Sequence, residues 1–266
     1  MRAATVLRSV ICRALAIVLA ALAALSSIAP VQAFADDSSQ PVKTVRVGWL
    51  VNNEGFQNGT PGERLSGWGY EYLQTLSYYT PGWRYEYVSG TFTELMDMLE
   101  AGEIDLMPNI SYSEERAQKL LFSSNREGTE RYYIYARPDR DDLAKGDPQA
   151  LQGLTIGYNS GVMQTIVGQQ WLANEGIVCT YREYDGGSVL FDALANGEVD
   201  AIIMNDTISS PEASPMFYVG SSDYYFAVPK SRPDLMDNIN SAMAAINRVN
   251  PRYNDEVKSN YSAQNS

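Results

Sequence analysis

The stretch "LEAGEID" (residues 99–105) returns later in the chain as "LANGEVD" (residues 194–200). In each copy an apolar segment with helical spacing runs into a glycine, and a short apolar segment follows. A glycine suits the left-handed backbone conformation that commonly ends a helix. Each copy therefore predicts a helix, a glycine stop and a buried strand, and the repetition predicts two similar half-molecules.

Two matching series of elements surround these copies. Alternating β-branched residues predict strands, and apolar residues at intervals of three and four predict helices. In the first series, strands are expected at 42–51, 84–90 and 103–109, with helices at 70–79 and 91–102. In the second, strands are expected at 154–161, 178–184 and 198–206, with helices at 162–176 and 188–197. Outside the two series we expect helices at 114–124 and 233–249 and strands at 131–139 and 224–230. The pattern predicts an α/β fold with two parallel-rich sheets flanked by helices.

A polar turn follows the repeated strand in each half, "PNIS" (residues 108–111) in the first and "MNDT" (residues 204–207) in the second. In open parallel sheets, ligands collect at the carboxyl ends of the strands. We therefore expect a ligand site built from both turns. The plainer alternative is that unrelated helix–glycine–strand connections converge on similar sequences and that their acids are simply solvated.

The composition excludes several classes of function. The 266 residues contain no histidine, which excludes Ser-His-Asp and Cys-His nucleophile systems and imidazole-bound zinc. The sequence "DRDD" (residues 139–142) lacks the spacing of a calcium loop, and no pair of acids is spaced to suggest a glycosidase. We expect neither a cofactor nor a metal. A hydrophobic content of 45% suits one large domain or two lobes of about 100 residues each.

The N-terminus has the features of an export signal. Arg2, Arg8 and Arg13 precede an apolar run, and the small residues Ala33 and Ala35 mark the expected cleavage region. We therefore expect residues 1–35 to be a signal peptide and the protein to be secreted or periplasmic. The alternative is an uncleaved membrane anchor, although the run is shorter than the roughly 20 residues that a spanning helix needs.

The mature chain is expected to be strongly acidic. It keeps 17 of the 20 basic residues and all 32 acidic ones, which gives a net charge of −15. Nucleic acid and anionic membrane surfaces are poor partners for such a chain. Cys179 is its one thiol, so an intramolecular disulfide is excluded and we expect a packed, inert side chain.

Several segments carry a resemblance to a known family. The sequence resembles the bacterial extracellular solute-binding proteins of the amino-acid type, family 3, over nearly all of residues 44–258. The most specific part is "GEIDLM…SYSEER…LFS" within residues 102–123. The segments that carry the resemblance are "SGWGYEYLQTL" (66–76), "FTELMDMLEAGEIDLMPNISYSEERAQKLLFSS" (92–124), "LQGLTIGYNSG" (151–161) and "LANGEVDAIIMNDT" (194–207).

The resemblance implies the two-lobed fold of type II periplasmic binding proteins with a double-crossing hinge. Lobe 1 would comprise residues 36–135 and 223–266, and lobe 2 would comprise residues 136–222. The crossings would fall near "YYIYAR" (132–137) and "SSDYYFA" (221–227). Ligand would close the cleft between the lobes by favouring the closed state.

The resemblance also implies a set of ligand-binding residues. Arg116 would hold the α-carboxylate of the ligand, because a planar guanidinium matches a carboxylate. Asp206 would hold the α-ammonium group, although an acid at this position is also typical of a turn or helix cap. The other candidates are Asn109 and Ser111 for polar contacts, Phe92 as an aromatic cover, the backbone of Asn159, Ser160 and Gly161 at a helix start, and Trp49 and Phe56 as pocket lining. The three aromatic residues could instead belong to the core.

Some positions depart from the family pattern. Pro108 has no N–H to offer a carboxylate, and Val162 stands where a hydroxyl residue is common. Glu54 is the one candidate for the acid that usually follows the first strand. We therefore expect an α-amino acid as the ligand, with a small peptide or another polar solute as alternatives.

These observations predict a monomeric, non-catalytic protein that captures a small polar solute for an ABC-type uptake transporter. Its partner would be a membrane permease. Two alternatives remain open. The chain could be a ligand-sensing input domain of a signalling system, or a dehydratase-type enzyme on the same scaffold, with Glu54, Glu71 or Asp206 as the general acid.

Overall fold

The computed structural model describes residues 42–207 and 209–264 of the chain. The predicted signal peptide, residues 1–35, lies outside these described residues. Within them, helices alternate with strands as an α/β fold requires, and none of the helices has the length and apolar character needed to cross a membrane.

The first predicted β-α-β-α-β series is confirmed. Its elements are β1 (Lys43–Leu50), α2 (Trp68–Tyr78), β2 (Trp83–Gly90), α3 (Phe92–Ala101) and β3 (Met107–Ser111). Strands β1 and β2 pair in parallel as a two-stranded sheet, and Leu106 makes a parallel bridge to Val47 of β1. The carboxyl ends of β1 and β2 therefore point in the same direction, toward the loop that begins α3.

Helix α3 shows how the repeated sequence produces its local structure. The Thr91 hydroxyl accepts from the Glu94 N–H, and the Glu94 carboxylate accepts from the Thr91 N–H, which makes a capping box at the helix start. Leu95 and Leu99 are fully buried. Gly102 ends the helix with φ 75°, so the predicted glycine stop is confirmed.

The second series belongs to a seven-stranded sheet in the order β3-β9-β5-β8-β6-β7, with β4 paired to β9. The elements of the second series are β6 (Thr155–Asn159), α5 (Met163–Asn174), β7 (Thr180–Tyr184), α6 (Gly187–Ala195) and β8 (Ala201–Asn205). The same sheet also contains β4 (Leu120–Phe122), β5 (Gly128–Ala136) and β9 (Ser214–Pro229). A short 3-10 helix, η1 (Pro148–Leu151), precedes β6. Strand β6 pairs in parallel with β7 and β8, whereas β5 and β9 run antiparallel to their neighbours. The larger sheet is therefore mixed, with its parallel part at β8-β6-β7.

Two expected elements have different bounds. Instead of a helix over 114–124, the chain forms the single turn α4 (Glu114–Ala117) and then β4, because Leu120–Phe122 pairs with the end of β9. Strand β9 begins at Ser214, ten residues before the expected strand, because its first part pairs with β5. Pairing between distant segments, which has no local sequence signal, decides both differences.

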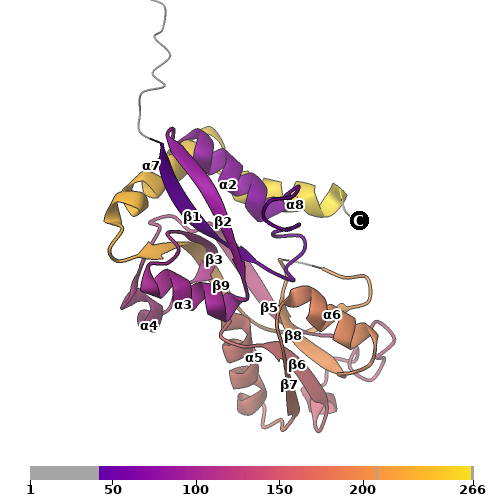
Figure 1. Cartoon of the computed structure of the whole chain (residues 1–266). Helices are drawn as coiled ribbons and strands as arrows, with labels where there is room; N and C mark the ends of the chain where they lie inside the picture. Colours follow the sequence, from indigo (N-terminus) through magenta and orange to yellow (C-terminus); the bar gives the residue numbers. More distant parts are fainter. Residues whose placement is uncertain (1–41, 208, 265–266) are drawn as a thin grey trace, which may run out of the picture. The chain divides into compact units, whose positions relative to one another are not determined.

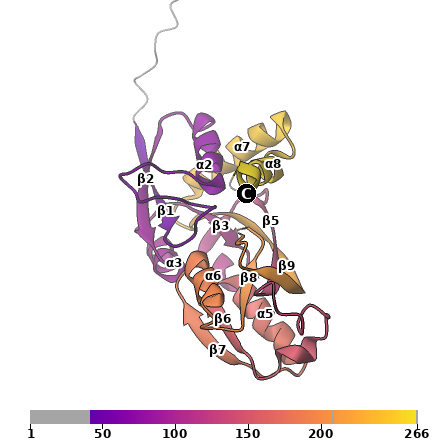
Figure 2. The ribbon, with the colours of Figure 1, turned by 90° about the vertical axis from the view of Figure 1, so that its right-hand side faces the viewer.

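Helices α5 and α6 cover opposite faces of the sheet around β8. Ile203 of β8 packs with Leu172 of α5, and its neighbour Ile202 packs with Leu190 of α6. Successive side chains of a strand point to opposite faces, so these contacts place one helix on each side. Figures 1 and 2 show this arrangement, with the parallel strands between the two helices.

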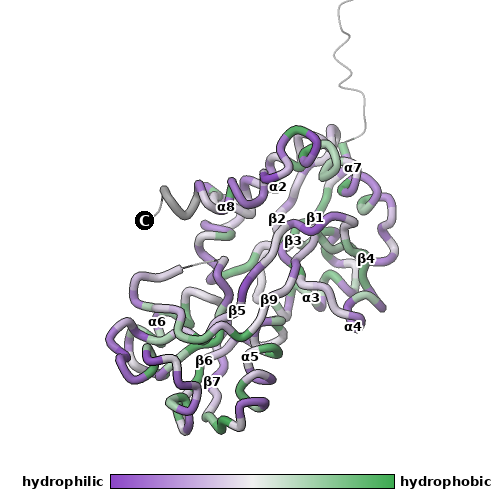
Figure 3. The backbone as a smooth tube through the Cα atoms, turned by 180° about the vertical axis from the view of Figure 1, so that it is seen from behind, coloured by the Kyte–Doolittle hydropathy of each residue, from purple (hydrophilic) through white to green (hydrophobic). Residues whose placement is uncertain are grey.

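A second pair of layers surrounds β1 and the end of β9. Helices α2 and α7 (Pro233–Val249) pack with Phe226 and Val228 of β9, whereas α3 packs in the cluster that contains Ala227. Helix α8 (Tyr253–Gln264) lies against α2, where Tyr253 and Thr75 share a hydrogen bond of 2.6 Å between their hydroxyls. Figure 3 shows hydrophilic residues along much of α8. The division into lobes at 135/136 and 222/223 stays a prediction.

Candidate ligand-binding site

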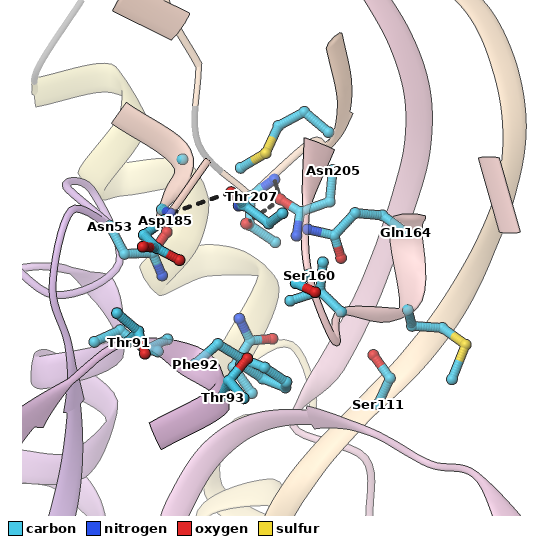
Figure 4. A pocket seen from close by; sticks show the side chains of 18 of the residues that line it. Asn53, Thr91, Phe92, Thr93, Ser111, Ser160, Gln164, Asp185, Asn205 and Thr207 are labelled. Atoms are coloured by element: carbon cyan, nitrogen blue, oxygen red, sulfur yellow. Dashed lines mark hydrogen bonds between the residues drawn. The ribbon is translucent and has the colours of Figure 1, made fainter. Parts of the chain in front are cut away.

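A pocket opens where the carboxyl ends of β1, β6, β7 and β8 meet the starts of α3, α5 and α6. It encloses about 760 Å³ of space between atoms, part of which is open to solvent. One wall includes Thr91, Phe92, Asn109, Ser111, Arg116 and Glu130. The other includes Asn159, Ser160, Gln164, Asp185, Asn205 and Thr207. Figure 4 shows Thr91 to Thr93 and Ser111 facing Ser160, Gln164 and Asn205 across the pocket.

Arg116 is held in place by backbone carbonyls. Its N–H lies at the start of α4 and donates to the Ser113 hydroxyl at 3.2 Å. The guanidinium Nη1 donates to the Ser111 carbonyl at 2.7 Å, and Nη2 donates to the Gly161 carbonyl at 2.8 Å. The Phe92 ring lies beneath the guanidinium carbon, with its centroid 5.4 Å away. Of the five guanidinium N–H groups, two are used by these carbonyls.

The charge of Arg116 is not balanced by a contacting acid. Burial lowers its pKa below the ordinary value for arginine, and no salt bridge within the described part of the chain includes it. A partly buried cation without an anion is costly in free energy. Arg116 therefore offers the pocket a positive charge and spare N–H donors.

Glu130 brings a carboxylate to the same pocket. It lies on β5 with 3% of its surface exposed. Its Oε1 accepts hydrogen bonds from the Ser111 hydroxyl at 2.9 Å and the Tyr132 hydroxyl at 2.7 Å, and its Oε2 accepts from the Asn205 amide at 2.8 Å. Burial raises the pKa of Glu130, whereas these donors oppose the rise by stabilising the ionised form.

A second buried acid, Glu127, lies behind the pocket. It is 1% exposed, and one oxygen accepts from the Asn109 N–H at 2.8 Å while the other has no partner. Burial raises the pKa of Glu127 to about 8. Asn109 lies in a register shift of β3 with φ 59°, next to Pro108, which has no N–H for the ladder. Its N–H consequently bonds the carboxyl group of Glu127.

The two walls touch beside the pocket. The Asn52 amide donates to the Asp185 carbonyl at 3.1 Å, and the Ser188 N–H donates to the Asn52 carbonyl at 3.2 Å. Gly186 lies between these residues with φ 110°, and a Cβ atom there would come within 2.6 Å of the Asn52 carbonyl oxygen. Close approach of the β1 and β7 ends therefore requires glycine at this position. Nearby, the Trp68 indole donates to the Thr207 carbonyl at 3.4 Å.

The structure brings together six of the ten predicted site residues. Phe92, Asn109, Ser111, Arg116, Asn159 and Ser160 all line the pocket. Gly161 contributes indirectly, because its carbonyl receives the guanidinium of Arg116. Whether these residues bind ligand stays a prediction.

Three predicted residues lie elsewhere, and their expected placement is corrected here. The Asp206 carboxylate accepts from the Arg131 N–H at 3.0 Å and lies 3.4 Å from the ammonium of Lys258, so it joins β8 to β5 and α8 outside the pocket lining. Trp49 is buried with its indole bonded to the Gly59 carbonyl. Phe56 is buried against Trp68, with ring centroids 4.6 Å apart.

Sequence reasoning missed several polar residues of the pocket, among them Asn205 and Glu130. Asn205 directly precedes Asp206, and the side chains of consecutive residues leave a strand on opposite sides, so matching the family's acid to Asp206 points to the side away from the pocket. Glu130 lies in "TERY" (residues 129–132), where the exposed Thr129 and Arg131 alternate with the buried Glu130 and Tyr132. This alternation was the available signal that Glu130 points inward.

The remaining candidates for the general acid of a dehydratase lie outside the pocket. Glu54 and Glu71 are exposed and do not line the pocket. Among the described residues, no three histidine, cysteine, aspartate or glutamate side chains are grouped so that they could hold a metal ion.

Comparison of the sequence with known protein families identifies the family of the chain. Residues 45–253 match the profile of the bacterial extracellular solute-binding proteins, family 3. The chain belongs to this family. The family membership that the sequence motifs suggested is therefore confirmed. Membership implies that the ligand is a small solute. No match is found among curated proteins.

Solved structures share the fold. A mutant of ArgBP from T. maritima is 20% identical, with a TM-score of 0.69 over 83% of this chain and 95% of that chain. A putative L-cystine ABC transporter from Listeria monocytogenes is 17% identical, with a TM-score of 0.70 over 83% and 96%. The ancestral amino acid-binding protein AncCDT-1, a precursor of cyclohexadienyl dehydratase, is 18% identical, with a TM-score of 0.70 over 82% and 95%. These likenesses show the type II periplasmic-binding-protein fold that the family resemblance implied.

Proposed function

We propose that this family 3 protein captures a small zwitterionic solute of the amino-acid class outside the cytoplasm and delivers it to an ABC-type uptake transporter. The observation that carries the proposal is the Arg116 guanidinium, which lines the pocket with no contacting carboxylate in the described chain. A ligand carboxylate would supply the missing anion. Charge-assisted hydrogen bonds of this kind contribute roughly 1.5–3 kcal/mol each.

The rest of the pocket supports a polar, uncharged or zwitterionic ligand. Its other side chains are mainly amides and hydroxyls, among them Asn159, Gln164 and Thr207. The names of the structural relatives point in the same direction, because ArgBP and the putative L-cystine transporter are named for amino acids. A net charge of −15 on the mature chain does not oppose binding of a carboxylate, because charges beyond about 10 Å are largely screened at 0.1 M salt.

Binding without turnover is the favoured activity. A dehydratase would need a protonated acid that faces the substrate. Glu54, Glu71 and Asp206 do not line the pocket. Of the two acids that do, Asp185 and Glu130, burial raises the pKa of Glu130, but the Ser111 and Tyr132 hydroxyls donate to its carboxylate and oppose that rise. We therefore expect no loss of substrate when the protein is incubated with any amino acid or hydroxy acid that it binds.

The proposal is tested with a thermal-shift panel of the twenty standard amino acids, dipeptides, and neutral sugars as polar controls without charge. A ligand at a hundred times its Kd stabilises the folded state by about 2.7 kcal/mol, so we expect an increase in Tm of several degrees for at least one amino acid. Calorimetry with that amino acid should give a Kd in the micromolar range. Shifts with sugars alone, or with no zwitterion, would contradict the proposal.

Delivery to a transporter needs a separate test, since a ligand-sensing protein would use the same pocket. Uptake of the radiolabelled amino acid is measured in cells with and without the gene. Loss of uptake, restored by the wild-type gene, is expected for a transporter component. Normal uptake in the deletion strain would favour the sensing alternative.

A further inference from the structure

Glu130 is a buried acid on the pocket wall. It is 3% exposed and lines the pocket, yet no salt bridge among the described residues includes it. Asp206, by contrast, contacts both Arg131 and Lys258. A buried charge is costly unless it is paired or solvated by hydrogen bonds. Glu130 has the hydrogen bonds, whereas a described cation that acts on it, Lys258, does so from beyond salt-bridge distance.

The donors around Glu130 fix what the pocket wall presents. Ser111 gives its hydroxyl hydrogen to Glu130, so the Ser111 oxygen can only accept a hydrogen bond from a ligand. Asn205 gives one amide hydrogen to Glu130, and its Oδ1 accepts from the Thr207 N–H at 3.1 Å. The wall therefore presents an acceptor, the Ser111 oxygen, directly in front of a negative charge.

The same pocket holds the opposite charge at Arg116. The two charged side chains influence each other, because Glu130 raises the pKa of Arg116, but no hydrogen bond joins them. Ser111 contacts both residues, through its carbonyl to Arg116 and through its hydroxyl to Glu130. A basic and an acidic group thus lie on either side of Ser111, and neither forms a salt bridge with another described residue.

We propose that Glu130, acting with the Ser111 hydroxyl oxygen, receives the ammonium group of the zwitterionic ligand. This inference rests on the proposed function and moves the anionic role from Asp206 to Glu130. The ammonium donates to the Ser111 oxygen and is attracted by the Glu130 charge behind it. Glu130 is therefore a specificity-determining residue that selects ligands with an ammonium group over those that carry a carboxylate alone.

The experiment compares two probes that differ in the ammonium group. L-Glutamine is the first probe, because its amide side chain suits the amide and hydroxyl groups of the wall, and glutaramate is the same molecule without the α-ammonium. If another amino acid binds more tightly in the panel, that amino acid and its deaminated analogue replace the pair. Calorimetry gives the Kd of each probe for the wild type and for Glu130→Gln.

We expect Glu130→Gln to weaken binding of the amino acid at least tenfold and to change binding of the deaminated analogue less than threefold. A purely structural role would instead weaken both probes equally. The matched control is Asp206→Asn, which removes an acid outside the pocket and should leave both affinities within threefold. The Tm of each variant confirms that it is folded.

A second substitution provides a rescue. In Glu130→Gln the new Nε2 group can face the Asn205 amide, which places two donors together. Adding Asn205→Asp supplies an acceptor for that donor, retains an oxygen for the Thr207 N–H and returns a negative charge to the wall. We expect the double variant to recover at least half of the lost binding free energy for the amino acid.

The outcomes separate this inference from the proposed function. If the wild type binds no amino acid, the proposed function fails and this assignment fails with it. If the wild type binds the amino acid and Glu130→Gln binds it equally well, the assignment of Glu130 alone is overturned. Equal losses for both probes, or a loss in Asp206→Asn instead, would also overturn it.

Discussion

Arg116 is the residue on which recognition of the ligand carboxylate depends. Replacing it with alanine removes the positive charge and the free N–H donors, so we expect Arg116→Ala to weaken amino-acid binding at least tenfold. Arg116→Lys keeps the charge but loses the planar fork, and an intermediate affinity is expected. Calorimetry measures the change.

The control for this change is Arg131→Ala, because the Arg131 side chain is mostly exposed and pairs with Asp206 outside the pocket. It should bind normally. An unchanged Kd in Arg116→Ala, with the Tm preserved, would remove Arg116 from the site.

Glu127 should make the free energy of unfolding decrease as the pH rises. Burial raises its pKa to about 8 in the folded chain, above the ordinary carboxyl value near 4.5. Between these two values the folded state keeps a proton that the unfolded state has lost. Stability is therefore fully present at low pH and falls as the pH rises toward 8, by on the order of 1 kcal/mol per pH unit.

Glu127→Gln tests this effect, because its amide resembles the protonated acid and can donate to an acceptor such as the unpartnered Asn109 oxygen. We expect urea unfolding to show a smaller loss of stability between pH 5 and pH 8.5 in the variant than in the wild type. Identical pH profiles would mean that Glu127 does not titrate in this range.

At the residue level the sequence located the residues around Arg116 better than those around Asp206. Arg116, Asn109 and Ser111 lie within the range of the most specific family segment, residues 102–123, so their positions could be assigned. The family resemblance assigned the ammonium-binding acid to Asp206, yet the neighbouring Asn205 lines the pocket. A shift of one residue reverses the side of a strand, and sequence alone does not fix that register.

At the level of elements, helix α5 depends on a glycine for its approach to the sheet. A Cβ atom at Gly168 would come within 2.7 Å of a methyl carbon of Ile203, which is fully buried on β8 and has no room to move. We expect Gly168→Ala to lower the free energy of unfolding by about 1–3 kcal/mol, despite the better helix propensity of alanine. Urea denaturation measures the change.

The comparison variant is Ile166→Ala on the exposed face of the same helix, where Ile166 keeps 57% of its surface exposed. It should leave stability within about 0.5 kcal/mol. A stable Gly168→Ala variant would mean that α5 can shift away from β8 without cost.

The elements themselves were predictable where local signals agree. Pro233 begins α7 and the Thr91 capping box begins α3, and both helices have nearly the expected bounds. Strand β9 was predicted over less than half of its length, because its first part follows β5 through pairing rather than through its own pattern. The same cause turned the expected helix over 114–124 into α4 and β4.

At the level of the whole molecule, Gly186 controls how closely the two walls of the pocket approach. A side chain there would meet the Asn52 carbonyl, so Gly186→Ala should hold the β1 and β7 ends apart. We expect amino-acid affinity to fall about tenfold. We also expect the radius of gyration with saturating ligand, measured by small-angle X-ray scattering, to exceed that of the wild type.

Gly153→Ala is the matched control, since Gly153 also has a positive φ but has no atom near its missing Cβ. Both variants place a side chain at a positive φ, 110° at Gly186 and 81° at Gly153, and only Gly186→Ala blocks the contact between the walls. Equal effects in the two variants would show that strain, rather than the contact, is responsible.

The hydrogen bond from the Trp68 indole to the Thr207 carbonyl has a practical consequence. Thr207 lines the pocket, and Trp68 packs against Phe56 and Tyr224 behind it. Indole emission depends on the polarity and hydrogen bonding of its surroundings, so a solute that shifts Thr207 changes the colour and intensity of the light that Trp68 emits. We therefore expect ligand binding to change the intrinsic tryptophan fluorescence, so that titrations can be followed without a label.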